Sequence, residues 1–494
     1  MASSKTSQSF TTSHKHTACD EYMSLSRRGF IAASGTAAAM MATTPAWLPR
    51  VAIARNFNAA AQDVIIQIYL RGGCDGLSVV VPFNEPRYIS SRPNLAMLPY
   101  DTGIDPGRAV LDLVSTSGST NGNSNASAAS ITAPGGRVFF GLHPAMTALM
   151  PAWIDGKLLL VQGAGMTNAS KSHFEAQRSM ETARLNDPTY ATGWLGRHLY
   201  SVDPMNPAAL VRAIGIADGL TRVLVGAPKA VPIPDLASST GNQPALSNFT
   251  GYGLRGPTAT RPARLGVLSD LYNATFDPVR AAAISTIDTI GLLNTIGAAG
   301  YSPGNGTIYP SNAIGNSLKS AAALINAEVG VEAIAVDYSG WDTHANQGTP
   351  IATGGPGTTT GGITAGSSLF VTMQSLANAV GAFYSDIIAA RGKRVTVVIM
   401  SEFGRNIGEN GTVGTDHGVG NMMMVLGSAI RGGRVLTNWP GISTNPATIA
   451  HNMDLGVTID YRDVLAEIVQ QRLGNPDLAS VFPGFTPTFR GVLL

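Results

Sequence analysis

The sequence predicts an α/β doubly wound fold, in which helices flank a mostly parallel β-sheet. Four segments are continuously rich in Val, Ile and Leu without alternation, which is typical of strands buried on both faces. Helical patterns lie between and after these segments, and such alternation indicates a parallel sheet covered by helices. The four predicted strands span residues 63–77, 157–166, 331–344 and 394–406.

Five segments carry apolar residues at the three-to-four spacing of a helix that packs on one face. These predicted helices span residues 172–185, 278–296, 317–329, 368–392 and 461–474. Polar stretches rich in small residues are expected to form exposed loops or insertions. They span residues 113–136, 236–262, 297–316 and 346–367. Because no repeat and no strong linker is present, residues 55–494 are expected to form a single domain, with a smaller inserted subdomain around 200–300 as an alternative.

The first 54 residues have the features of an export signal. Arg27 and Arg28 precede a weakly apolar, Ala-rich stretch that ends in a small-x-small sequence at Ala52–Ala54. Paired arginines in this context are typical of a twin-arginine signal. An amphipathic N-terminal helix would need a polar face, which the stretch lacks. We therefore expect a periplasmic or secreted protein that uses the twin-arginine export machinery.

The composition excludes several classes of protein. The formal net charge is +2 and charged residues make up 13% of the chain, so no basic stripe suited to nucleic acid is present. Cys19 lies in the expected signal and Cys74 is the other cysteine, so an internal disulfide is not expected after export. No apolar run after the signal reaches the roughly 18 residues that a membrane span needs.

Acidic and histidine side chains follow the predicted strands at the points where those strands end. In open α/β sheets, ligands bind beyond the carboxyl ends of the strands. Ser172, followed by His173, is placed to cap a helix after the second strand. The other residues expected at this edge are Asp75, Asp342, His344, Glu402, Asp416 and His417.

Carboxylates and imidazoles from several strand ends are the ligands of a divalent metal site. Mixed nitrogen and oxygen ligation favours Zn or Mn, whereas mostly oxygen ligation favours Mg. We therefore expect one or two divalent ions bound by Asp75, Asp342, His344, Glu402, Asp416 and His417. The alternative is a hydrogen-bonded structural cluster, since single residues of these types also serve as turn or cap residues.

These motifs, in this order, resemble a known family. The motifs GGCDGL, SHFEAQ, GWDTH, VVIMSEFGRN and GTDHGVGN occur within residues 62–485. This arrangement resembles the exported family called domain of unknown function 1501, which is grouped with the alkaline phosphatase superfamily. The resemblance implies an alkaline-phosphatase-like fold with glycine- and serine-rich insertions.

The superfamily resemblance also implies roles for single residues. Asp75 matches the metal-binding Asp after the first strand. Ser172 matches the nucleophile at a helix N-terminus, where free N–H groups and the helix dipole favour an anion. Ser170 and Thr167 are the alternative nucleophiles. Arg405 or Arg71 would hold a non-bridging substrate oxygen, unless these arginines are solvated or cap a backbone.

Two departures from the superfamily pattern affect the expected metal site. One residue separates Asp342 from His344, whereas the superfamily commonly has three. The superfamily strand that ends in Ser-Asp-His-Gly corresponds here to Ser401–Gly404, with Phe403 in place of an imidazole. Asp416 and His417 would stand in for the last ligand or replace the missing pair. The consequence is one metal, a more oxygen-rich site, or a scaffold without turnover.

The expected function is metal-dependent hydrolysis of phosphate or sulfate esters, with a small anionic ester as substrate. The alternative is an exported binding or assembly protein that keeps the fold without hydrolysis. A redox enzyme is not supported, because the sequence lacks CxxC, haem-attachment and post-strand GxGxxG motifs. His143 is expected as a substrate contact or a helix cap. Cys74 is expected to be a buried small residue and not a nucleophile.

Overall fold

The structure is a computed structural model that describes most of the chain after residue 62. It covers residues 63–99, 108–113, 130–133, 136–167, 170–217, 219–233, 260–273, 277–299, 301–353, 359–439, 441–442 and 454–494. All of these residues belong to one compact unit of the chain. The predicted export signal at residues 1–54 lies outside them. Within the described segments, none of the helices is both long and apolar enough to cross a membrane.

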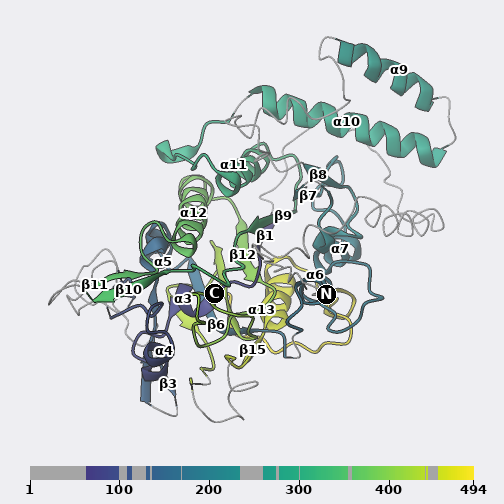
Figure 1. The fold of residues 1–494 in the computed structure, drawn as a ribbon. Helices are drawn as coiled ribbons and strands as arrows, with labels where there is room; N and C mark the ends of the chain where they lie inside the picture. Colours follow the sequence, from purple (N-terminus) through teal and green to yellow (C-terminus); the bar gives the residue numbers. More distant parts are fainter. Residues whose placement is uncertain are drawn as a thin grey trace, which may run out of the picture. The chain divides into compact units, whose positions relative to one another are not determined.

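A nine-stranded mixed sheet forms the centre of the unit (Figure 1). Its strands follow the order β14-β6-β13-β12-β1-β9-β7-β8, and β15 pairs with β6. Neighbouring strands are parallel except at β13, which runs antiparallel to both β12 and β6. The strands are β1 (Val64–Arg71), β6 (Leu158–Gly165), β7 (Ala213–Ile216), β8 (Ala230–Ile233), β9 (Ala333–Ser339), β12 (Val395–Ser401), β13 (Asn421–Gly427), β14 (Arg434–Leu436) and β15 (Ile459–Asp460).

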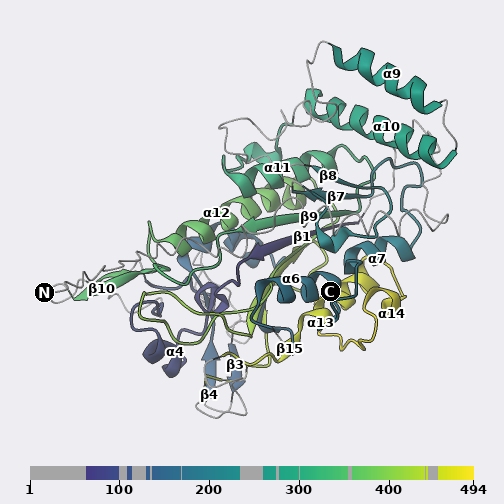
Figure 2. The ribbon, with the colours of Figure 1, turned by 45° about the vertical axis from the view of Figure 1, so that its right-hand side comes forward.

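Helices cover both faces of the sheet, as Figure 2 shows for the groups around α12 and α13. The two faces of β1 explain this layering, because its successive side chains point to opposite sides. Ile66 and Ile68 pack in the cluster that contains α11 and α12 side chains. Ile65 and Tyr69 pack in the cluster that contains α6, α7 and α13 side chains.

The remaining elements are helices and short hairpins around the sheet. The helices are α3 (Gly76–Val79), α4 (Pro86–Ser91), η2 (Pro144–Leu149), α5 (Met150–Ile154), α6 (His173–Thr182), α7 (Trp194–Ser201), η3 (Arg222–Leu224), α9 (Arg261–Asn273), α10 (Asp277–Ala299), η5 (Gly304–Gly306), α11 (Ala313–Asn326), α12 (Ser368–Phe383), η6 (Tyr384–Ala389), α13 (Tyr461–Glu467), η8 (Ile468–Arg472) and α14 (Leu478–Val481). The two-stranded sheets are β2 (Val80–Val81) with β5 (Gly141–Leu142), β3 (Ser130–Ala133) with β4 (Gly136–Phe139), and β10 (Thr349–Thr353) with β11 (Thr359–Gly362).

The structure confirms the α/β class and the large, mostly parallel sheet flanked by helices. It also places two hairpins where the sequence predicts only loops, β3–β4 and β10–β11. Their strands contain β-branched Thr, Ile or Val, which favour extended backbone even in a polar segment. Strand β13 was not predicted, because its Met-rich sequence NMMMVLG carries little of the Val and Ile signal that marks a strand.

Candidate metal centre

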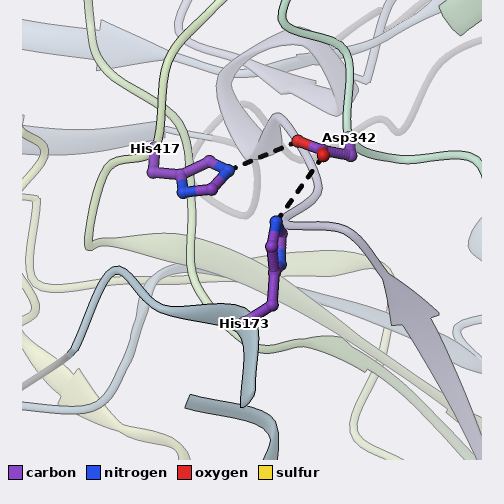
Figure 3. Close-up of side chains that lie close together, drawn as sticks. All are labelled: His173, Asp342 and His417. Atoms are coloured by element: carbon purple, nitrogen blue, oxygen red, sulfur yellow. Dashed lines mark hydrogen bonds and ion pairs between the residues drawn. The ribbon is translucent and has the colours of Figure 1, made fainter. Parts of the chain in front are cut away.

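Three candidate ligand side chains converge at the carboxyl edge of the parallel strands (Figure 3). Atoms of His173, Asp342 and His417 lie within 4.8 Å of one another. Asp342 follows β9, and His173 is the first residue of α6, which starts beyond the end of β6. His417 precedes β13, and because β13 runs antiparallel, its beginning lies at the edge where its neighbours end.

The ligand atoms lie close enough together for one bound ion. Asp342 Oδ2 lies 3.6 Å from His173 Nε2, and Asp342 Oδ1 lies 3.3 Å from His417 Nε2. Two ligands bound to one zinc ion at ordinary bond lengths lie about 3.3 Å apart. His173 Nε2 is buried and makes no hydrogen bond in the described part of the chain. The three side chains therefore fit a divalent ion held between them.

The second ring nitrogen of each histidine is already held by the protein. Nδ1 of His173 lies 2.9 Å from Glu402 Oε1, and Nδ1 of His417 lies 2.9 Å from the Lys171 carbonyl oxygen. Metal-binding histidines usually donate this second N–H to a carboxylate or a carbonyl, which orients the ring and directs the other nitrogen to the metal. Both rings therefore have the orientation that a metal-binding imidazole needs.

His344 approaches the same group from the more exposed side. Its Nε2 lies 3.1 Å from Asp342 Oδ1 and 2.9 Å from His417 Nε2. Its Nδ1 lies 2.9 Å from Asp416 Oδ1, and Asn410 donates to the same carboxylate oxygen at 3.2 Å. His344 is thus in position to be a further ligand, while Asp416 orients its ring.

The pKa values at this centre reflect these ion pairs. Burial lowers the pKa of His173, but the neighbouring carboxylates of Asp342 and Glu402 outweigh burial and raise it to about 9. The hydrogen bond to Asp342 raises the pKa of His344, and the hydrogen bond from His344 lowers the pKa of Asp416. Burial raises the pKa of Glu402, yet hydrogen bonds from His173 and Gln177 lower it overall. The Asp342 and Glu402 carboxylates therefore favour the protonated form of His173.

Glu402 holds a ligand in place by accepting several hydrogen bonds. Besides His173, Gly72 N donates to its Oε1 at 2.7 Å and Gln177 Nε2 donates at 3.1 Å. Ser401 Oγ lies 3.1 Å from its Oε2. The sequence predicts Glu402 as a metal ligand, whereas the structure places it behind His173 as the carboxylate that orients that ring.

Arg405 is predicted to hold a substrate oxygen, but the structure engages its guanidinium inside the protein. Arg405 is buried, and its Nη2 donates to Asp342 Oδ1 at 2.6 Å. Its other nitrogens donate to the carbonyls of Gly73 at 2.6 Å and Thr415 at 2.8 Å. Arg405 therefore fixes the Asp342 carboxylate and the loops on either side of it.

Asp75 reaches the same sheet edge but has a different set of partners from those of a metal ligand. Its carboxylate is fully buried and accepts from Arg92 Nη1 at 2.6 Å and Arg92 Nη2 at 3.0 Å. Ser78 Oγ and Gln347 Nε2 also donate to it, at 2.6 and 2.5 Å. Burial raises the pKa of Asp75, but the Arg92 charge and these hydrogen bonds lower it overall. This bidentate ion pair gives Asp75 a structural role in place of the predicted ligand role.

The serine predicted as nucleophile lies directly beside the centre. Ser172 is the N-cap residue of α6, and its side chain makes no capping hydrogen bond there. Ser170 Oγ, the alternative, donates to Glu175 Oε2 at 2.6 Å and accepts from Ser172 N at 3.1 Å. Thr167, the other alternative, is exposed before a segment outside the described residues.

The other residues singled out in the sequence have structural partners. His143 caps η2 by accepting from Ala145 N at 3.1 Å, and burial lowers its pKa to about 3. Burial raises the pKa of the Cys74 thiol well above its usual value. Arg71 donates to Glu181 at 2.8 Å and to Asp337 at 2.9 Å.

His173 is the candidate ligand that the sequence prediction omitted. Its signal was present, because it follows Ser172 at the start of a helix and lies four residues before Gln177, on the same helical face. Phe403, at the position where the sequence resemblance implies an imidazole, packs its ring 5.0 Å from that of His173 and 4.6 Å from that of His417. An apolar ring therefore borders both of these histidines.

A comparison with protein families supports the predicted relationship. The family model described as a protein of unknown function (DUF1501) matches residues 317–477. Residues 317–477 are therefore similar to this family. It spans β9, β12 and β13 and so includes Asp342, His344 and His417, while His173 lies outside it. No curated protein and no solved structure matches the chain.

Proposed function

We propose that the protein is an exported metal-dependent hydrolase of phosphate or sulfate esters, acting in the periplasm or outside the cell. The observation that carries this proposal is the convergence of His173, Asp342 and His417 within 4.8 Å, with the second nitrogen of each histidine held by the protein. The resemblance of the motifs to the alkaline phosphatase superfamily supports the reaction class.

One ion fits this site better than two. The ligand atoms surround a single position, and the Phe403 ring packs against both histidines. A divalent ion there, Zn or Mn by the nitrogen and oxygen donors, would act as a Lewis acid toward an ester oxygen. His173, Asp342 and His417 would hold that ion, and His344 would complete its ligand set.

Ser172 is the residue of this chain best placed to attack the ester. It precedes a ligand in sequence and begins α6, whose first N–H groups favour an anionic ester at the same place. Glu402 would orient the His173 ring, and Arg405 would fix the Asp342 carboxylate.

The test combines metal analysis with activity. Protein purified after export should contain one equivalent of metal and should hydrolyse an aryl phosphate or an aryl sulfate. Ser172→Ala should retain the metal and lose activity by at least about a hundredfold, consistent with loss of a nucleophile. Ser170→Ala is the matched control, two residues earlier in the chain, and should keep most of the activity. Equal activity of Ser172→Ala and the wild type would rule out Ser172 as the nucleophile.

A second function, as an exported binding or assembly protein without hydrolysis, is favoured by Phe403. The Phe403 side chain is 1% exposed and belongs to the apolar cluster that contains α6 and α13 side chains. Because this apolar ring stands where the resemblance implies a metal-binding imidazole, a metal at the centre would serve structure or ligand binding. Bound metal with no turnover of either ester would favour this function over hydrolysis.

A further inference from the structure

A buried polar network joins the loops that carry the candidate ligands, and Gln347 lies at its centre. Gln347 is completely buried, three residues after His344. Its Oε1 accepts from Thr343 Oγ1 at 2.9 Å and from Thr415 Oγ1 at 2.7 Å. Both threonines adjoin ligands, because Thr343 follows Asp342 and Thr415 lies two residues before His417.

The Gln347 amide also reaches a third loop. Its Nε2 donates to Asp75 Oδ2 at 2.5 Å, in the turn after β1. Asp75 is paired with Arg92, which in turn donates to the carbonyls of Asn406 at 2.9 Å and Ile407 at 2.6 Å. An ionised carboxylate can only accept hydrogen bonds. The Asp75 carboxylate therefore requires that the nitrogen of the Gln347 amide points towards it.

Backbone contacts show that the two ligand loops lie directly against each other. Thr415 N donates to Thr343 O at 3.1 Å, and Gln347 N donates to Val413 O at 2.9 Å. Gln347 therefore joins both loops through its side chain and its backbone. A shift of Gln347 would change the spacing between Asp342 and His417.

We propose that Gln347 is a positioning residue for the metal centre, setting the separation of the Asp342 and His417 ligand atoms. This inference rests on the proposed function, since it concerns the same metal site. Groups that orient ligands without touching the metal typically change metal affinity by about 10–100-fold when they are replaced. The reason is that a ligand pair held at the wrong separation must be moved when the ion binds.

The experiment uses Co²⁺ as a spectroscopic probe of the whole protein. Gln347→Met keeps the length of the side chain but removes the amide hydrogen bonds to Thr343, Thr415, Asp75 and Ser78. Ser78→Ala is the matched control for the Asp75 end of the network: Ser78 is also fully buried, donates to the same oxygen of Asp75 at 2.6 Å and accepts from Gln347 Nε2 at 3.5 Å, but its hydrogen-bond partners in the described part of the chain include neither Thr343 nor Thr415. Gln347→Met should weaken Co²⁺ binding by about tenfold or more and shift the visible absorption bands, whereas Ser78→Ala should bind within about twofold of the wild type.

The possible results distinguish failure of the positioning role from failure of the metal site itself. Wild-type affinity and spectrum in a folded Gln347→Met protein, or the same change in Ser78→Ala, would overturn the positioning role alone. A wild-type protein that binds no Co²⁺ would overturn the metal site itself and the inference with it. If Gln347→Met does not fold, Thr343→Val and Thr415→Val each remove one donor to Gln347, and each should weaken Co²⁺ binding by several-fold; unchanged binding in both would overturn the proposal.

Discussion

At the scale of single residues, the histidines at this centre use their two ring nitrogens differently. One nitrogen of each ring is held by Glu402, the Lys171 carbonyl or Asp416, and the other faces Asp342. The sequence predicts Asp342, His344 and His417 at this place, because they follow a strand or lie between glycines. It could not distinguish a ligand from the carboxylate behind a ligand, as Glu402 shows, because that difference depends on a few ångströms.

The pKa of His173 leads to a prediction about metal affinity. Burial lowers this pKa, but Asp342 and Glu402 raise it to about 9, so the imidazole is protonated at neutral pH in the metal-free protein. An ion binds only the neutral ring and must displace this proton. The apparent Zn²⁺ affinity should therefore rise with pH towards 9, by about tenfold per unit for one displaced proton.

Competition with a chelator at several pH values measures this dependence. Glu402→Gln removes the negative charge beside His173 Nδ1, which lowers the pKa of the ring. In Glu402→Gln, the rise of the apparent Zn²⁺ affinity with pH should end at a lower pH than in the wild type. An affinity that stays constant between about pH 6.5 and 8.5 in the wild type would contradict the assignment of His173 as a ligand.

At the scale of elements, two loops approach each other backbone to backbone beside the centre. One contains Glu402 and Arg405, and the other contains His417. A Cβ added at Gly404 would lie 1.8 Å from the Gly420 carbonyl oxygen. The glycine in the motif SEFG is therefore required for this close approach and not for a ligand contact.

Gly404→Ala should push these loops apart. We expect the free energy of unfolding to fall by about 1–3 kcal/mol, as in other overpacked sites, and metal affinity to fall with it. Gly411→Ala is the control in the neighbouring loop, since a Cβ there meets no atom within 4 Å among the described residues. Denaturant titration and metal analysis of both variants give the comparison. Equal stability of the two variants would show that the loops can separate freely.

At the scale of the whole molecule, the C-terminal segment is anchored in the core. Val492 is completely buried, its N–H donates to Glu467 Oε1 at 2.6 Å, and its carbonyl accepts from Arg431 N at 2.9 Å. Thr488 N and the Arg490 guanidinium donate to Asp463. Two carboxylates of α13 thus hold the last residues against the sheet.

Val492→Ala should lower the free energy of unfolding by about 1.5–3 kcal/mol, the value for fully burying a side chain of this size. Leu494→Ala should change it little, because the Leu494 side chain is largely exposed, at 83%. Thermal or urea unfolding of the two variants measures the difference. Similar losses in both would mean that the segment is anchored by its backbone alone.

The sequence by itself determined the strands β1, β6, β9 and β12, the helices with three-to-four spacing, and the residues that follow those strands. Continuous apolar runs and three-to-four spacing are local signals, so β1, β6, β9 and β12 were predicted from them. The tertiary structure alone decided which of those residues meet. The reversed direction of β13 brings His417 to the common edge, and Arg92 engages Asp75 across the fold. Such pairings depend on strand order and on contacts between residues far apart in the chain, which periodicity does not encode.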